Sequence, residues 1–593
     1  MNRSSISVAV ATLVLSAAAA PVSGQFEAAP PLEILYGFTL IDGLGGPPIE
    51  DAALAIRGNE ILTVSSRREL LSGPNAPRNA VPVNLGGGWV IPGLIDAHVH
   101  LATNPNRTSA EAELYRQLYG GVTAVRDMAG DARALASLAR DSRLGEIDAP
   151  DVYYAALLAG PSFLADPRPQ SSAAGETAGS VPWMQAVTPD TDIRDAVAQA
   201  KGTFASGIKI YANLSAADVT RITEEGHRQG MQVWAHSMVF PARPLEVVRA
   251  GVDVVSHVCR LAWEAMADAP TEYHHDRSPQ FGTFSADSPV FTELFGEMRS
   301  QGTILDATLA LYARADSLSR DDPEGPAAER CDTDFARQLV ARAHAEGVPI
   351  AAGTDFTSAP DAPYPSLHRE LEELVRAGLP PMAAIEAATR VAAEAIGVQD
   401  RLGTLQHGRP VTFVLLAENP LEDIANLRSV RAVWKNAERY DRAAYRPVIA
   451  DTRRQPATET RGATSARQAL ELWLALWRRY DLDGLDQVFL RDASLTYFAS
   501  DTEGLLEGYE AVLQHHRELG FLPGGYQPER ELWVEDVLVA DFDESAVITG
   551  TWYFGNRVGP QTAARGRLTM VLVRTSNGYK ISHLHLGDDR TGG

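Results

Sequence analysis

Short apolar runs alternate with stretches of helical spacing from Trp89 to about Val398. Eight such runs end at or near His98, Arg126, Ala155, Ile210, His236, His257, Ala307 and Ala352. Strands that alternate with helices form parallel sheets, and eight such units are typical of a (β/α)8 barrel. The pattern therefore predicts an α/β fold with a TIM-type barrel over residues 91–400.

The pattern differs on both sides of this barrel. Residues 31–90 and 401–445 contain short apolar runs broken by polar residues, Gly and Pro, such as Leu54–Arg57 and Thr412–Leu416, which are typical of strands. We expect the two segments to form one composite β-sandwich domain. The Pro-, Thr- and Arg-rich stretch over residues 446–464 predicts a linker.

A separate α+β domain is predicted over residues 465–593. Ser465 is followed three residues later by Gln468, which is the spacing of a capping box at a helix start. Apolar residues then recur at helical spacing up to Tyr480, and strand-like runs follow later in the segment. Helices followed by a run of strands favour an α+β arrangement.

The N-terminus predicts export. Arg3 supplies a positive charge, Val8–Ala20 forms a short apolar run, and small residues precede Gln25. These features are typical of a signal peptide, which we assign to residues 1–24. No run reaches the length of about 18 apolar residues that a membrane span needs, and no Cys lies near the cleavage site to carry a lipid. We expect a periplasmic or secreted protein without a membrane anchor.

The charge composition of the chain limits which kinds of molecule it is expected to bind. The chain has 53 basic and 76 acidic residues, which gives a net charge of −23. Such a charge repels phosphate backbones and anionic lipids, and it argues against nucleic acid as a partner. The two cysteines, Cys259 and Cys331, could pair in an oxidising compartment or remain separate buried thiols, because sequence alone does not supply their geometry.

Five residues of metal-ligating type and one lysine occupy corresponding places in the predicted barrel strands. His98 and His100 are two residues apart, so their side chains point to the same face of a strand. The others lie in or at the ends of later strands: Lys209, His236, His257 and Asp355. Barrel active sites lie at the carboxyl ends of the strands, and imidazole suits zinc and similar ions. A single buried histidine is usually structural, but the whole set predicts a metal site.

The combined motifs resemble the amidohydrolase superfamily, in particular its imidazolonepropionase-like and prolidase-like members. The resemblance covers about residues 31–445. Its matching segments are Pro92–His100, Gly120–Asp127, Gly207–Tyr211, His236, Ser256–His257, Gly353–Asp355, Ala384–Thr389, Gly403–Gly408 and Asn419–Leu421. One departure is Pro410–Thr412, where members usually carry an Ala-Asp pair. It puts a turn of the β-sandwich in doubt and leaves the metal site intact.

This resemblance implies a binuclear centre that holds two divalent ions, expected to be zinc. His98, His100 and Asp355 would bind one ion, and His236 and His257 would bind the other. Lys209 would bridge the two after N-carboxylation, because an unmodified ammonium group repels cations.

A mechanism follows from the same resemblance. A metal-bound hydroxide would attack the carbonyl, and Asp355 would take its proton and pass it to the leaving nitrogen. Tyr211 either donates a hydrogen bond to the developing oxyanion or packs at the barrel rim. The expected reaction is hydrolysis of a C–N bond in a small-molecule amide, cyclic amide or small peptide, as in a dipeptidase or prolidase.

Two other functions stay open at this point. A mononuclear, deaminase-like hydrolase would hold one metal and leave Lys209 unmodified. A non-catalytic binding protein would act through the C-terminal domain, which resembles the SnoaL-like, ketosteroid-isomerase-like fold. Such folds often dimerise or enclose small ligands, so the C-terminal domain is also the place where a homo-oligomer would form.

A second histidine pair and two long loops are not expected to hold the metal. His583 and His585 repeat the spacing of the barrel pair without clustered ligands, and we expect them to be sheet or pocket residues. The loops Gly160–Pro182 and Ala262–Pro289 are expected to be irregular and to set the substrate, which the sequence does not identify.

Overall fold

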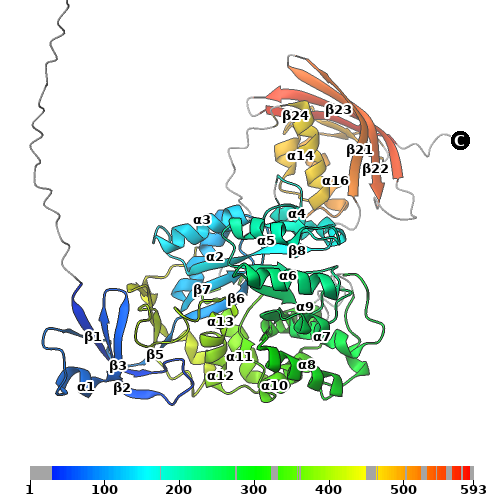
Figure 1. The fold of residues 1–593 in the computed structure, drawn as a ribbon. Helices are drawn as coiled ribbons and strands as arrows, with labels where there is room; N and C mark the ends of the chain where they lie inside the picture. The colour runs from blue at the N-terminus through cyan, green and yellow to red at the C-terminus, as the bar shows by residue number, and fades with distance from the viewer. Residues whose placement is uncertain are drawn as a thin grey trace, which may run out of the picture. The chain divides into compact units, whose positions relative to one another are not determined.

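The structure is a computed structural model that describes residues 30–587 apart from several short segments. Those left undescribed within this range are 174, 274–276, 322–330, 357, 360–361, 449–462, 464, 501–503, 523–530, 543, 556–563 and 576–577. The predicted signal peptide and most of the predicted linker therefore lie outside the described residues. The chain divides into two compact units, one of Met1–Pro105 and Ala110–Pro447 and the other of Asn106–Ser109 and Val448–Gly593 (Figure 1).

Parallel strands form the barrel that the sequence predicts. Within the described part of the chain they are β6 (Leu94–Val99), β7 (Val122–Asp127), β8 (Asp151–Ala159), β11 (Gly207–Ile210), β12 (Gln232–His236), β13 (Val254–Ser256), β14 (Ile304–Asp306) and β15 (Ile350–Ala351). Each is hydrogen-bonded to the next. The amide of Ala97 donates to the carbonyl of Ala352 at 2.9 Å, and that of Asp355 donates to the carbonyl of His98 at 2.8 Å. These bonds join the last strand to the first.

Helices cover the outside of the barrel (Figure 1). They are α2 (Arg107–Tyr119), α3 (Ala132–Arg143), α5 (Ile193–Gly202), α6 (Ala216–Arg228), α7 (Pro244–Arg249), α8 (Pro289–Gln301), α9 (Leu309–Asp321), α10 (Thr333–Ala345), α11 (Leu367–Arg376), α12 (Pro381–Ala387) and α13 (Arg390–Ala395). Helix α6 illustrates how they form. Ser215 and Asp218 make a capping box at its start, and Val219 and Ile222 are buried at helical spacing.

The loop after β8 is more regular than its composition predicts. Residues 160–182 contain η1 (Pro161–Ala165), α4 (Pro167–Ser172) and β9 (Ser180–Val181), and β9 pairs with β10 (Met184–Ala186) beside β8. The difference has a local cause, because Asp166 caps α4 by accepting from the amide of Arg168 and a proline follows the cap. The loop after β13 holds η2 (Val258–Ala265) and η3 (Phe281–Thr283).

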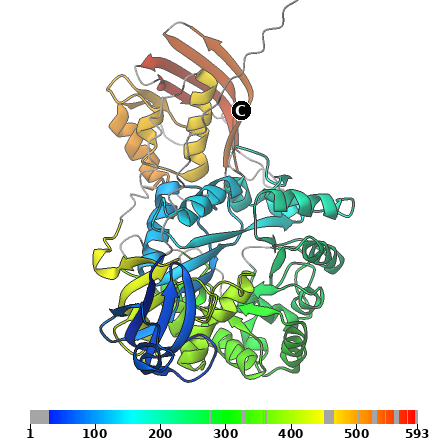
Figure 2. The ribbon, with the colours of Figure 1, turned by 60° about the vertical axis from the view of Figure 1, so that its left-hand side comes forward.

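The segments before and after the barrel share one eight-stranded sheet (Figure 2). Its strands are β1 (Leu32–Leu40), β2 (Ile49–Arg57), β3 (Glu60–Ser66), β4 (Val81–Asn84), β5 (Trp89–Pro92), β16 (Phe413–Leu416), β17 (Val430–Lys435) and β18 (Glu438–Asp441). Short helices accompany them: α1 (Arg67–Ser72), η4 (Ile424–Arg428) and η5 (Arg442–Ala444). Strand β5 pairs in parallel with β1 and antiparallel with β16. The sheet therefore depends on both segments at once.

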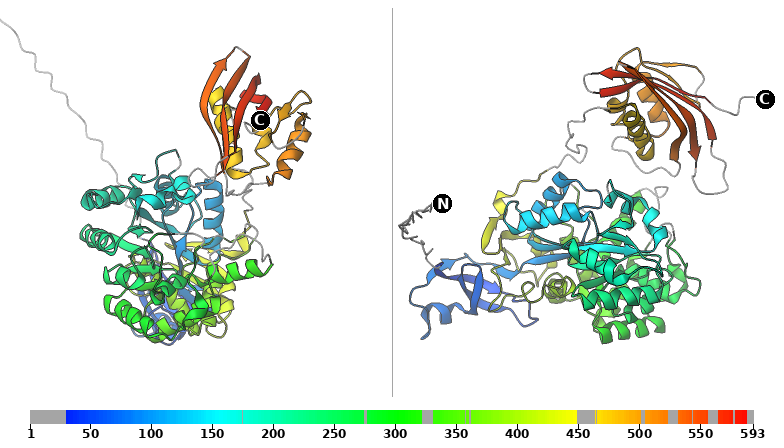
Figure 3. Two further views of the ribbon diagram at one scale, coloured as in Figure 1. Left: turned by 90° about the vertical axis from the view of Figure 1, so that its right-hand side faces the viewer. Right: turned by 45° about the horizontal axis from the view of Figure 1, so that its top comes forward.

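The second unit has the predicted α+β arrangement. Its elements are α14 (Ala466–Arg479), α15 (Leu485–Val488), β19 (Thr496–Phe498), β20 (Leu506–Glu507), α16 (Tyr509–Glu518), β21 (Glu531–Asp541), β22 (Ser545–Gly555), β23 (Ala564–Thr575) and β24 (Gly578–Leu586). The sheet curves beside α14 and α16 (Figure 3, right). Ser465 caps α14 by accepting from the amide of Gln468, and Trp473 and Trp477 are buried in the core of this unit. No helix among the described residues is long and apolar enough to cross a bilayer.

A buried lysine links the eight-stranded sheet to the barrel. Lys435 on β17 is only 5% exposed, and its Nζ lies 3.0 Å from a carboxylate oxygen of Asp151 at the start of β8. It also donates to the carbonyl oxygens of Ser142 at 3.1 Å and Ala149 at 2.8 Å. The ammonium group is therefore fully surrounded by barrel oxygens.

We expect Lys435→Met to destabilise this unit by about 3–5 kcal/mol, because the Asp151 carboxylate would stay buried without its cation. Urea unfolding of the full chain, followed by circular dichroism, measures the effect. Lys201→Met removes an exposed lysine and serves as the matched control, with an expected change below about 1 kcal/mol. Equal effects of the two substitutions would contradict the assignment.

A candidate metal centre at the barrel mouth

The six predicted site residues line a single cavity at the carboxyl ends of the strands. The cavity has a volume of about 440 Å³, and its lining includes His98, His100, Lys209, His236, His257 and Asp355. Tyr211 lines the same cavity. The structure therefore brings together every residue that the sequence analysis singles out in the barrel, from β6, β11, β12 and the segments after β13 and β15.

Asp355 lies at the centre of the histidine cluster. One of its carboxylate oxygens is 3.3 Å from Nε2 of His98 and 2.9 Å from Nε2 of His100, and the other is 3.7 Å from Nδ1 of His257. One ligand atom each from His98, His257 and Asp355 lie within 4.8 Å of one another, close enough to hold one ion. The ring of His236 is 4.5 Å from that of His257.

The electrostatics of the cavity suit metal binding. Burial lowers the pKa of His236 and His257 well below the usual range, so both rings are neutral and can offer a lone pair. Burial opposes the charged form of Asp355, but the neighbouring histidines outweigh it and hold the pKa of that carboxyl below its usual range. Among the described residues, Nζ of Lys209 is buried without a hydrogen-bond partner, and burial lowers its pKa to about 7.

Asp306, at the end of β14, orients the ring of His98 through a hydrogen bond. Its carboxylate lies 2.7 Å from Nδ1 of His98, accepts from Oγ of Ser256 at 2.8 Å, and pairs with Arg126 at 3.2 Å. Because the carboxylate accepts a hydrogen bond from Nδ1–H of His98, the lone pair on Nε2 faces the cavity. Neither Asp306 nor Arg126 was predicted from the sequence to be a site residue. The available signal was a charged residue inside an otherwise apolar strand.

The backbone at the site is held in an uncommon conformation. His257 has a φ of +78° and Asp355 a φ of +55°, both in the left-handed region that favours glycine. Asp96, which is buried, secures the segment before Asp355 by accepting from the amide and hydroxyl of Thr354 at 3.1 and 2.8 Å. Burial raises the pKa of Asp96 to about 7. Strained positions of this kind concentrate where function fixes side-chain direction.

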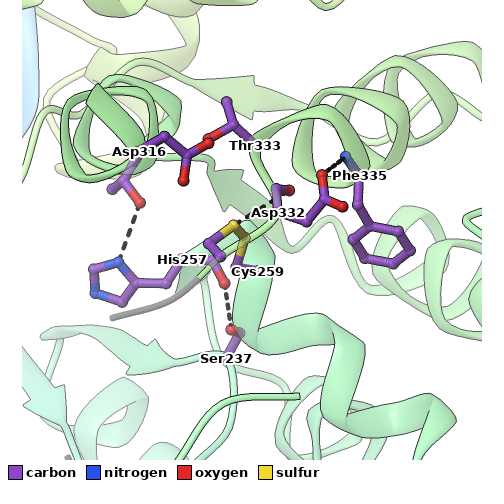
Figure 4. The surroundings of a disulfide bond; sticks show 9 residues. Ser237, His257, Cys259, Asp316, Asp332, Thr333 and Phe335 are labelled. Atoms are coloured by element: carbon purple, nitrogen blue, oxygen red, sulfur yellow. Dashed lines mark hydrogen bonds between the residues drawn. A yellow bond between two sulfur atoms is a disulfide. The ribbon is translucent and has the colours of Figure 1, made fainter. Parts of the chain in front are cut away.

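A disulfide joins Cys259 to Cys331, with the Cα atoms 6.0 Å apart (Figure 4). Cys259 lies two residues after His257, and Cys331 precedes Asp332, the residue that caps α10. The bond therefore ties the segment leaving the site to the start of that helix. This answers the question that the sequence left open about the two cysteines.

Tyr211 lies between the histidine cluster and a charged group at the cavity wall. Its ring is 4.7 Å from that of His236 and stacks on Phe163 at 4.3 Å. Its hydroxyl accepts a hydrogen bond from Nη1 of Arg168 at 3.0 Å. Arg168, which the sequence analysis did not single out, thus lines the cavity together with Tyr211.

The histidine pair near the C-terminus lies in a different setting. His583 on β24 is hydrogen-bonded to Oγ1 of Thr496 at 2.8 Å, and His585 is exposed on the same strand. Neither belongs to the cluster of metal-ligating groups found among the described residues.

Comparisons with known proteins agree with this fold. Residues 296–439 match the amidohydrolase family, and residues 466–587 match the SnoaL-like domain. Ochratoxinase of Aspergillus niger is 29% identical over 476 residues, covering 71% of this chain and 89% of that protein. Imidazolonepropionase of Aromatoleum aromaticum is 26% identical over 372 residues, covering 61% of this chain and 84% of that protein. The crystal structure of a Xaa-Pro dipeptidase with bound methionine in the active site superposes with a TM-score of 0.55 at 22% identity, covering 69% of this chain and all of that one.

The barrel and its site define a hydrolase of the class that acts on carbon–nitrogen bonds. The chain is thus similar to the amidohydrolase family in the barrel and the strands that follow it, and to the SnoaL-like domain in its second unit.

We expect Asp306→Asn to lower hydrolytic activity by about 10- to 100-fold, because His98 would lose the carboxylate that fixes its tautomer. Ser256→Ala is the graded control, since it removes a single hydrogen bond to the same carboxylate and should cost less. Activity is compared at equal folded fraction, checked by circular dichroism. An Asp306→Asn enzyme as active as the wild type would contradict the orienting role.

Proposed function

We propose that the chain is a metal-dependent hydrolase. Its proposed reaction is cleavage of an amide bond in a small molecule, in the compartment to which the protein is exported. The observation that carries this proposal is the convergence of six potential ligands on one cavity. His98, His100 and Asp355 would hold one divalent ion, which we propose to be zinc, and His236 and His257 a second. A bound metal would polarise the substrate carbonyl and lower the pKa of a water molecule.

The donor set fits such ions. Neutral imidazole and carboxylate are the groups that zinc prefers among nitrogen and oxygen ligands. The Nδ1 atoms of His98, His100 and His236 lie near oxygen atoms of Asp306, Thr103 and Met238 respectively. Bonds of this kind fix the ring orientation of metal-ligating histidines. The cavity therefore supports both the ligands and the partners that orient them.

Lys209 is proposed to act as a carbamate. Its amine is 1% exposed and has no acceptor among the described residues, which is costly for an ammonium ion. When the neutral amine attacks the carbon of CO2, an N–C bond would form, the electron pair of one C=O π bond would move to oxygen, and one proton would pass from the nitrogen to solvent water. The anionic product would place two oxygens in the cavity beside the histidines.

Asp355 is the residue placed to move the proton. In the hydrolysis, the water oxygen bonds to the carbonyl carbon, the C–N bond breaks, and the nitrogen leaves as an amine. Asp355 accepts the proton of the attacking water and returns it to that nitrogen. The hydroxyl of Tyr211 is proposed to stabilise the carbonyl oxygen as its charge develops.

A mononuclear site is the second candidate. Among the residues that the structure describes, the groups close enough to bind one ion are those of His98, His257 and Asp355, which combine ligands expected for two separate ions. In that arrangement Lys209 would remain an amine. Metal stoichiometry separates the two candidates.

We also propose that the protein is exported, as the N-terminal sequence predicts. The disulfide between Cys259 and Cys331 supports this proposal, because disulfides persist in oxidising compartments such as the periplasm.

Metal analysis of the purified full-length protein tests the proposed function. We expect about two zinc ions per chain and hydrolysis of members of a dipeptide and N-acyl amino-acid panel. His98→Ala should lower the metal content, because a ligand is lost. It should also lower the hydrolysis rate by at least about 100-fold. His585→Ala, from the exposed second pair, is the matched control and should change neither. A metal-free wild-type protein, or an active His98→Ala, would refute the proposal.

Lys209→Ala tests the carbamate. We expect this variant to bind at most one ion and to lose activity, and we expect acetate or propionate to restore part of both by supplying carboxylate oxygens in the vacated space. Full metal content and activity in Lys209→Ala would instead support the mononuclear site.

A further inference from the structure

Helix α11 contacts the chain segments next to two of the proposed metal ligands. Ser366, at the start of this helix, donates from Oγ to the carbonyl of Phe356 at 3.0 Å, and Phe356 directly follows Asp355. Glu370 lies four residues after Ser366, which places both side chains on the same face of the helix. Glu370 is directed from that face at α9, the helix beside α11 (Figure 1).

Glu370 holds the first turn of α9. Its two carboxylate oxygens accept from the amides of Leu309 at 3.1 Å and Ala310 at 2.6 Å. The side chain is fully buried, and burial raises the pKa of its carboxyl group, while the two amide hydrogen bonds lower that pKa. The first amides of a helix have no acceptor within the helix, so Glu370 supplies the acceptors that they lack. It therefore fixes where α9 begins.

The residue before α9 contacts a proposed ligand. Thr308 is fully buried and has a φ of +52°, and its Oγ1 lies 3.1 Å from Nδ1 of His257. The backbone of His257 is held separately, by donation from its amide to the carbonyl of Asp306 at 2.9 Å. That backbone bond leaves the imidazole ring free to rotate about its side-chain bonds. The contact with Thr308 sets the rotation, because Nδ1 reaches this oxygen only in one orientation of the ring.

The same turn of α9 also forms part of the cavity wall. Leu311, Tyr312 and Ala315 all line the cavity. A displacement of the start of α9 would therefore move both the hydroxyl that orients His257 and this wall. Glu370 is not among the described residues that line the cavity, so its effect on the site has to pass through α9.

We propose that Glu370 is a positioning residue for the metal centre. Through the first turn of α9 it keeps Thr308 in place, and Thr308 holds the ring of His257 beside His98, with 5.0 Å between the ring centroids. This inference rests on the proposed function, because it requires an ion that binds His257. It adds a residue that touches neither the ion nor the substrate and yet sets how firmly the ion is held.

The rate of zinc release tests the proposal. The full-length protein is loaded with zinc, and removal of the zinc by a chromophoric chelator is followed over time. We expect Thr308→Val, which keeps the shape of the side chain and removes its hydroxyl, to speed release by about 10-fold or more. Thr308→Ser keeps the hydroxyl and should release zinc at nearly the wild-type rate. Glu370→Gln should also speed release, because its NH2 group replaces one of the two acceptor oxygens.

Glu373→Gln is the matched control. Glu373 lies on the same helix, is only 1% exposed, and pairs with Arg337 and Arg376. Its substitution disturbs buried ion pairs of α11 without removing an acceptor from α9. We therefore expect a lower thermal midpoint for Glu373→Gln together with zinc release at the wild-type rate. This comparison separates the positioning of His257 from a general loss of stability.

Hydrogen exchange in the metal-free protein gives a readout that does not depend on zinc. In Glu370→Gln, peptides that contain the amides of Leu309 and Ala310 should exchange faster than in the wild type. In Thr308→Val these amides should keep their protection, because Glu370 still accepts from both. The two variants should thus differ in the order of α9 while both release zinc faster.

Three results would contradict these expectations. Zinc release at the wild-type rate from either Glu370→Gln or Thr308→Val would overturn the proposal. Equal acceleration in Glu370→Gln and Glu373→Gln would also overturn it, since the effect would then come from general loosening of α11. A wild-type protein that binds no zinc would refute the proposed function itself, and this inference with it.

Discussion

The buried carboxylate of Asp306 is the interaction on which the site depends. Asp306 and Arg126 are both fully buried, and removing two charges from water is costly unless their geometry is satisfied. Arg126 therefore also donates to the carbonyl of Ala97 and lies over the ring of Trp234. Through these contacts one ion pair connects β6, β7, β12 and β14 inside the barrel and fixes His98 in a single orientation.

Several contacts hold the strained backbone conformations at the barrel mouth. His257, Thr308 and Asp355 all have positive φ values, although none is glycine. Thr308 holds the ring of His257 through Oγ1, Asp96 secures the turn before Asp355, and the disulfide anchors the segment after His257. The strain persists because these bonds leave the segments no relaxed alternative. Its consequence is that the side chains of His257 and Asp355 point in fixed directions at the barrel mouth.

Sequence reasoning reached the barrel and its strand ends because both are local. A run such as Gly207–Ile210 marks a strand by its own residues, and a polar group at the end of such a run must emerge at the mouth. It did not reach Asp306 as the partner of His98, because β14 comes near β6 only when the barrel closes through β15. Arg168 was missed for a similar reason: its loop has no periodicity, and its role appears only when α4 places it beside Tyr211 and Tyr273.

Chemistry and selectivity therefore come from different parts of the chain. The proposed ligands arise from strands or the residues directly after them, where the barrel ladder fixes the backbone. Phe163, Arg168 and Tyr273 instead come from the loops after β8 and β13. Because loops tolerate change more readily than strands, substitutions there can alter the group that is recognised while the ligand cluster stays in place.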